Sequence, residues 1–133
     1  MTPFIDTNIF IRHITADDPV QSPACLAFFQ AIERGETTGR TSPLVVAEIV
    51  FVLSRIYKLN RAGIRDAILP LLLLPGIRLD QKQMMSRVFE LFVTTSIDYI
   101  DAYHAASLEG RGGQLYSYDK HFDRIPNLQR LEP

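Results

Sequence analysis

The chain has 133 residues and a formal net charge of −1, and 47% of its residues are hydrophobic while 22% are charged. These values are typical of one globular domain and exclude a disordered or fibrous chain. No block of lysine and arginine indicates a nucleic-acid partner, and the single cysteine, Cys25, excludes a disulfide framework.

Neither a signal peptide nor a membrane span is indicated. The opening sequence MTPFIDTN has a carboxylate at position six and lacks the positive and apolar regions of a signal peptide, so we expect a cytoplasmic protein. The longest strongly apolar run, Ala67 to Gly76, is interrupted by Pro70. It is shorter than the roughly 20 residues that a transmembrane helix needs.

Strand and helix patterns alternate along the first half of the chain. An apolar strand at Pro3–Ile5 precedes a short helix, and a longer helix is predicted over residues 17–36, capped by Asp17 or Asp18. After an extended segment at residues 38–42, the next helix has Ser42 at its N-cap and Pro43 at its first position. A further helix begins after the cap residue Asn60 and has a kink at Pro70.

The second half continues the alternation. Helical spacing of Met84, Val88, Leu91 and Phe92 predicts a helix over residues 80–95, in which the methionines fill the core. The other predicted elements are a helix over residues 98–113 and strands at residues 76–79, 114–118 and 128–132. This order predicts one α/β domain over residues 1–133, with a mostly parallel sheet covered on both faces.

Asp6 directly follows the first predicted strand. Ligands of parallel sheets bind beyond the carboxyl ends of the strands, so Asp6 is a candidate site residue. The structural alternative is that Asp6 caps the helix beginning at Thr7 or Asn8, or makes an Asx turn there.

Glu48 is the only charged residue in SPLVVAEIVFVLS, whose helix is apolar on every side and is therefore expected to be buried. Because an unpaired buried carboxylate is costly, Glu48 should face a cation. That cation is either a bound metal ion or the arginine of a structural ion pair.

Two further acidic segments complete the candidates. Asp98 and Asp101 lie three residues apart where a helix begins, so they could be an N-cap and a first-turn residue, although we favour a functional role for Asp101. In SYDKHF, Asp119 follows another strand two residues after Ser117, and Asp123 is a weaker candidate one turn later.

The motifs FIDTNIF, an acid inside an early helix, DAYHAA and SYDKHF together resemble the PIN-domain family, and most closely its VapC-type toxins of bacterial toxin–antitoxin pairs. The resemblance covers nearly the whole chain. It implies a three-layer α/β/α sandwich and an acidic quartet of Asp6, Glu48, Asp101 and Asp119, with Asn8 beside the first acid. The fourth motif usually begins with threonine, where this chain has Ser117.

The chemistry of such a quartet indicates a metal site. Carboxylates that share a pocket need cations between them, and oxygen ligands favour Mg²⁺ or Mn²⁺. Zinc is disfavoured because His13, His104 and His121 show no paired ligand spacing. A held ion would activate water for hydrolysis of a phosphodiester. Arg12 and Arg40 are weak candidates for phosphate contacts.

The resemblance further implies an RNA substrate, a homodimer and a small antitoxin partner. Val50, Phe51, Leu53 and the run Leu71–Leu74 could form a protein interface, or could equally belong to the core. A DNA nuclease and a non-catalytic binding domain remain open alternatives. A HAD-like phosphatase is disfavoured, since it needs a second acid where this chain has Asn8.

Overall fold

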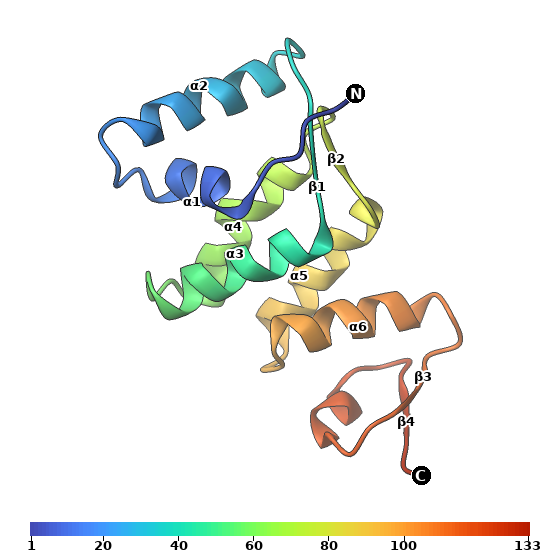
Figure 1. Cartoon of the computed structure of the whole chain (residues 1–133). Helices are drawn as coiled ribbons and strands as arrows, with labels where there is room; N and C mark the ends of the chain where they lie inside the picture. The colour runs from blue at the N-terminus through green and yellow to red at the C-terminus, as the bar shows by residue number, and fades with distance from the viewer. The chain divides into compact units, whose positions relative to one another are not determined.

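A computed structural model describes all residues from Met1 to Pro133, and they form two compact units, Met1–Lys82 and Gln83–Pro133 (Figure 1). The first unit contains α1 (Thr7–Thr15), α2 (Gln21–Glu33), β1 (Gly39–Thr41), α3 (Pro43–Arg55), α4 (Arg61–Leu72) and β2 (Ile77–Leu79). After the 3₁₀ turn η1 (Lys82–Met84), the second contains α5 (Met85–Thr94), α6 (Tyr99–Glu109), β3 (Gln114–Tyr116), η2 (Lys120–Arg124) and β4 (Gln129–Leu131).

Every strand pair is parallel, as predicted. In the first unit β1 pairs with β2, and the predicted first strand is reduced to a bridge between Phe4 and Arg40. Two backbone bonds flank this bridge, from Ile5 N–H to the Arg40 carbonyl and from Arg40 N–H to the Pro3 carbonyl. In the second unit β3 pairs with β4.

The helix starts of the first unit follow local signals. Ser42 Oγ accepts a hydrogen bond from Val45 N–H at 3.3 Å, and Pro43 occupies the first position of α3, as predicted. Asn60 Oδ1 caps α4 by accepting from Gly63 N–H. The helix α2 begins later than predicted, because Asp18 Oδ1 accepts from the N–H groups of both Val20 and Gln21 before the helix starts.

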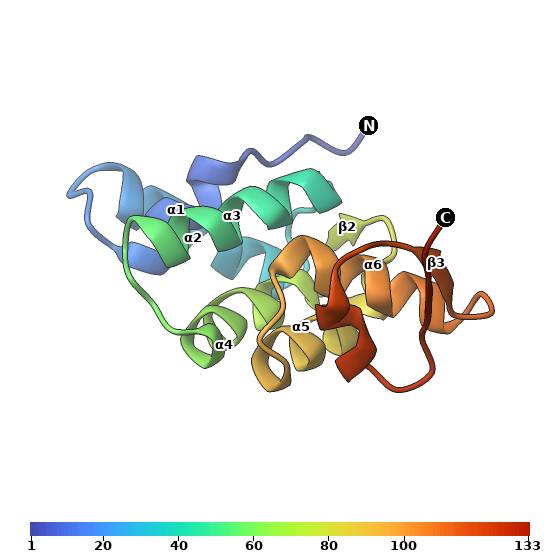
Figure 2. The same cartoon turned by 90° about the horizontal axis from the view of Figure 1, so that it is seen from below.

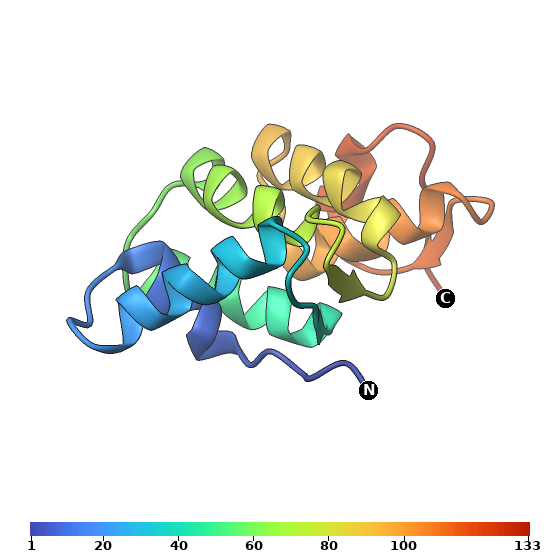
Figure 3. The same ribbon diagram turned by 90° about the horizontal axis from the view of Figure 1, so that it is seen from above.

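Apolar faces of the helices form the core of the first unit. The helices α1 and α2 pack side by side, as do α1 and α3 (Figures 2 and 3). Fully buried side chains come from four helices and one strand: Phe10, Ile32, Val46, Ile49, Leu53, Ile64, Ile68, Leu72 and Ile77. This core fixes the direction in which α1 and α3 present their polar residues.

In the second unit α5 packs on α6, because small residues of α6 allow close approach. Ala102 and Ala105 are fully buried, beside an aromatic cluster of Phe89, Phe92 and Tyr99. Arg87 of α5 also binds Glu109 of α6, with Nη2 2.8 Å from Oε1. Met84 is only half-buried, whereas the other predicted core residues of this segment are buried. None of the helices combines the length and apolar character of a membrane span.

Candidate active site

The carboxylate of Asp6 is exposed at the point where the N-terminal strand segment meets α1. Asp6 occupies the N-cap position with extended backbone angles, φ −80° and ψ 163°, but its side chain makes no capping hydrogen bond. The structural alternative, in which the side chain caps the helix, is therefore wrong. Asp6 presents an ionisable group that α1 does not use.

The prediction that Glu48 is buried is wrong. Only one side of α3 packs in the core, formed by Val45, Val46, Ile49, Val50 and Leu53. Apolar residues also lie on the outer side, where Leu44 is 81% exposed and Phe51 is 58% exposed, and Glu48 is exposed as well. Glu48 has no salt bridge, so the alternative of a structural pair with an arginine is not found either.

Asp6, Asn8 and Glu48 line one pocket of about 310 Å³ in the first unit, together with Arg12 and Tyr57. The packing of α1 against α3 brings these residues together from distant parts of the sequence. The positive charge of Arg12 is directed to Asp17 and Gln21, with Nη1 3.4 Å from Asp17 Oδ1. Both pocket carboxylates therefore lack a protein cation as a partner.

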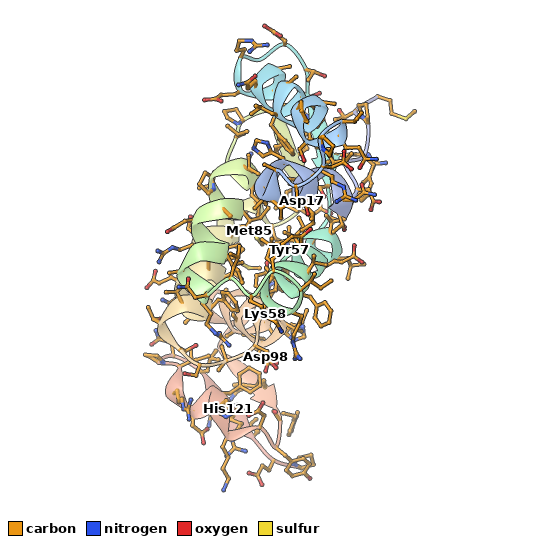
Figure 4. All side chains as sticks on the ribbon, turned by 90° about the vertical axis from the view of Figure 1, so that its left-hand side faces the viewer. Asp17, Tyr57, Lys58, Met85, Asp98 and His121 are labelled. Carbon is orange, nitrogen blue, oxygen red and sulfur yellow. The ribbon has the colours of Figure 1, made fainter.

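A hydrogen-bonded group around Asp17 orders the side of this pocket that Tyr57 and Arg12 form. The hydroxyl of Tyr57 donates to Asp17 Oδ2 at 2.7 Å (Figure 4). This bond, then the hydroxyl of Thr15, and more weakly the charge of Arg12, hold the pKa of Asp17 below its ordinary value. Sequence reasoning missed Tyr57, because it lies beyond the end of α3, where helical periodicity gives no signal.

Replacing Tyr57 by Phe should raise the pKa of Asp17 towards its ordinary value. A lowered carboxyl pKa stabilises the fold at pH values above the unfolded pKa, and this contribution is lost as the pH falls through the folded pKa. The difference in melting temperature between wild type and Y57F should therefore be larger at pH 7 than at pH 3.

Carboxyl NMR titration of Asp17 measures the shift directly. The control is Tyr118→Phe, which alters an exposed tyrosine that has no hydrogen-bond partner and should leave the titration unchanged. Identical Asp17 titrations in wild type and Y57F would show that this hydrogen bond contributes nothing.

In the second unit, Asp98, Asp101 and Asp119 interact electrostatically. Asp98 occupies the N-cap of α6 without a side-chain capping bond, and Asp101 is half-buried in the first turn. Burial raises the pKa of Asp101, and the negative charges of Asp119 and Asp98 raise it further. Such a carboxylate gains from a nearby cation.

Asp119 has local partners that Asp6 and Glu48 lack. Its Oδ1 atom accepts from His121 N–H at 2.9 Å and lies 3.2 Å from His121 Nδ1. The N–H of Asp119 donates to Ser117 Oγ at 3.0 Å, so the hydroxyl that replaces the usual threonine positions the Asp119 backbone. Figure 4 shows His121 and Asp98 in this unit.

Asp123, the weaker candidate, has a structural partner. Its Oδ1 atom lies 2.9 Å from Arg130 Nε, and hydrogen bonding to Arg130 lowers the pKa of Asp123. Because Arg130 also contacts Glu132, these side chains form an ion-pair group that ties β4 to η2. Asp123 is consequently the least available carboxylate among the predicted residues.

Comparison with known protein families matches the PIN domain to residues 4–128 of the chain. The chain belongs to the PIN-domain family. The match confirms the predicted PIN-like α/β fold, and PIN domains are commonly nucleases that use divalent metal ions. A search of curated proteins found no match.

The oxygen atoms in the pocket of this PIN domain are the kind of ligand that a hard divalent cation prefers. Asp6 and Glu48 offer carboxylate oxygens that no protein group neutralises, and Asn8 adds an amide oxygen in the same pocket. Oxygen ligands of this kind suit Mg²⁺ or Mn²⁺. Within either unit, no three acidic, histidine or cysteine side chains lie close enough to hold an ion by themselves.

Proposed function

We propose that this PIN domain is a Mg²⁺- or Mn²⁺-dependent endoribonuclease, one domain over residues 1–133, and the toxin of a type II toxin–antitoxin pair. The observation that carries the proposal is the pocket in which Asp6 and Glu48 lie together without any cationic partner. Two unpaired carboxylates in one pocket repel each other unless a cation lies between them.

In this proposal Asp6, Glu48, Asp101 and Asp119 hold the metal. When bound, the ion supplies an activated water and stabilises the charge that develops on the phosphate oxygens. The Asn8 amide can donate a hydrogen bond to a substrate oxygen beside Asp6. Ser117 positions Asp119, while Asp98 and Asp123 act as accessory charges, Asp98 by raising the pKa of Asp101.

The antitoxin and homodimer parts of the proposal rest on exposed apolar side chains. Phe51 and Leu73 are exposed, at 58% and 44%, and are available to a protein partner. Val50, Leu53 and Leu72 are buried in the core, so these members of the predicted interface are excluded. Leu44 also extends the exposed apolar side of α3.

Incubation of the purified protein with structured RNAs tests the activity. Cleavage is expected with 5 mM Mg²⁺ or Mn²⁺, about 100-fold less in EDTA, and full recovery when the metal is restored. The same sequences made as DNA separate a ribonuclease from a DNA-directed enzyme. Cleavage that persists unchanged in EDTA would reject the metal site.

A non-catalytic PIN-like binding domain is the second candidate. It is favoured by the absence of three clustered ligands within either unit. A Mg²⁺ titration followed by thermal unfolding separates the two, because a ligand that binds only the folded state stabilises it by about 2.7 kcal/mol at 100 times its Kd. No change in melting temperature together with no cleavage would favour the binding domain.

A further inference from the structure

Three residues on β1, β2 and the neighbouring N-terminal segment form an exposed row in the first unit. Arg40 of β1 is in register with Arg78 of β2, and Phe4 is bridged to Arg40 on the other side. All three are exposed, whereas Ile5, Gly39, Thr41 and Ile77 are buried on the opposite face. We name Phe4, Arg40 and Arg78 the strand patch; Figure 1 shows the N-terminal segment, β1 and β2 that carry it.

The two arginines of the patch have no acidic partner. Arg40 Nε donates to the Thr2 carbonyl at 3.1 Å, and its guanidinium carbon lies 5.1 Å from the centre of the Phe4 ring. Arg78 makes no salt bridge. Like charges directly opposite each other on paired strands destabilise a sheet, and neighbouring strands are only about 4.8 Å apart. The arrangement therefore has an electrostatic cost that an anion would remove.

A pocket of about 630 Å³ extends the positive surface beside Arg40 and Arg78. Lys82 lines this pocket and donates to the carbonyl oxygens of Leu74 and Ile77, which holds its ammonium group close to β2. Asp80 is the only acid in the lining, and it forms no salt bridge. Three cationic side chains and one acid leave the pocket with a net positive charge.

We propose that the strand patch binds a single-stranded segment of the nucleic-acid substrate, with phosphates at Arg40 and Arg78 and a base against Phe4. Arginine suits phosphate because its planar group donates several parallel hydrogen bonds. An exposed aromatic ring beside a positive groove is the arrangement on which single-stranded bases stack. An acidic peptide would use the arginines but gains nothing comparable from Phe4.

The position of the patch in the chain places a bound nucleic-acid strand close to Asp6. Phe4 and Asp6 are both exposed and Ile5 between them is buried, as expected for alternate residues of an extended segment. Two residues of extended chain span about 7 Å. A strand held on Phe4 and Arg40 therefore lies within about one nucleotide of Asp6. The inference that this strand is the substrate held beside Asp6 rests on the proposed nuclease function.

Binding of a labelled 12-nucleotide oligouridine in EDTA, followed by fluorescence anisotropy, tests the patch without cleavage. The double variant R40Q/R78Q should bind at least about 10-fold more weakly than wild type. The slope of log K against log salt should also fall by about 1.4, because each phosphate contact on a single strand contributes about 0.7.

The matched control is R34Q/R65Q, which removes two surface arginines that already pair with Glu36 and Asp66 in the same unit. It has the same charge change and should leave the binding curve within about twofold of wild type. The variant Phe4→Leu should weaken binding about 5- to 100-fold without changing the salt slope, because it removes stacking and no charge. Thermal unfolding of each variant verifies that it is folded.

The outcomes separate this inference from the nuclease proposal. Patch-dependent binding by a wild-type protein that cleaves nothing would support the patch and reject the nuclease. Cleavage by wild type with unchanged binding in R40Q/R78Q would overturn the patch and leave the nuclease standing. Displacement of the oligonucleotide by polyglutamate at an equal concentration of charge would overturn nucleic acid as the occupant.

Discussion

Replacing Asp6 by Asn should reduce RNA cleavage by more than about 100-fold while the protein remains folded. Substitution of residues that only orient metal ligands typically lowers metal affinity or activity by about 10- to 100-fold. The loss of a ligand itself should have a larger effect. The substitution preserves the shape of the side chain. It also breaks no internal bond, because the Asp6 carboxylate is exposed and makes no capping contact.

Asp101→Asn should have the same effect on cleavage for a different local reason. Burial and the charges of Asp119 and Asp98 raise the pKa of Asp101, so the neutral amide removes a repulsion in the metal-free protein. In EDTA, D101N should therefore be at least as stable as wild type. Loss of cleavage would then come from the site and not from unfolding.

Single-turnover cleavage and Mg²⁺-dependent melting temperature measure these effects together. Wild type should be stabilised by Mg²⁺, and D6N and D101N should lose most of this stabilisation. Asp66→Asn is the control, since it alters a surface acid of α4 whose partner is Arg65. Cleavage by D6N or D101N within threefold of wild type would reject the acidic site.

Local sequence signals were sufficient where a few neighbouring residues determine the structure. Ser42 with Pro43, and Asn60, each satisfy backbone groups within three residues, and both predicted helix starts are confirmed. The start of α2 was predicted too early, because Asp18 bonds to two N–H groups in a turn that precedes the helix. Both outcomes depend on hydrogen bonds that lie within one turn.

The exposure of Glu48 could not be derived from such local signals. The apolar sequence of this helix predicts core on every side, but α3 packs on one side only and leaves Leu44 and Phe51 exposed beside Glu48. Periodicity gives the apolar content of each side of a helix, whereas the number of covering neighbours depends on tertiary packing. The inference of a cation near Glu48 now rests on the pocket shared with Asp6.

The availability of each acid is also a tertiary property. Sequence placed Asp6, Asp119 and Asp123 in similar positions after strands or turns, yet their environments differ. Asp123 binds Arg130 of β4, Asp119 binds His121, and Asp6 binds neither a cation nor a backbone donor. The arginine partner marks Asp123 as a carboxylate that stabilises the fold, whereas the carboxylate of Asp6 is free to bind a ligand.

Gly113→Ala should destabilise the second unit by at least about 2 kcal/mol, the largest effect expected of an alanine substitution at any glycine of the chain. Gly113 has φ +70°, and a Cβ atom there would collide with the backbone carbonyl oxygen of Asn127. Backbone cannot move aside as a flexible side chain can. The same glycine accepts a 2.6 Å bond from Gln129 N–H and donates to the Leu108 carbonyl.

Gly112→Ala separates the two sources of this effect. Gly112 has φ +87° but open space where a Cβ atom would lie, so its substitution carries only the backbone strain of about 1 kcal/mol. Urea unfolding should give a clearly lower midpoint for G113A than for G112A, and equal midpoints would refute the collision. Because Gly113 joins α6 to β3, displacement of β3 would also move Ser117 and Asp119, so G113A should lose cleavage activity even where it remains folded.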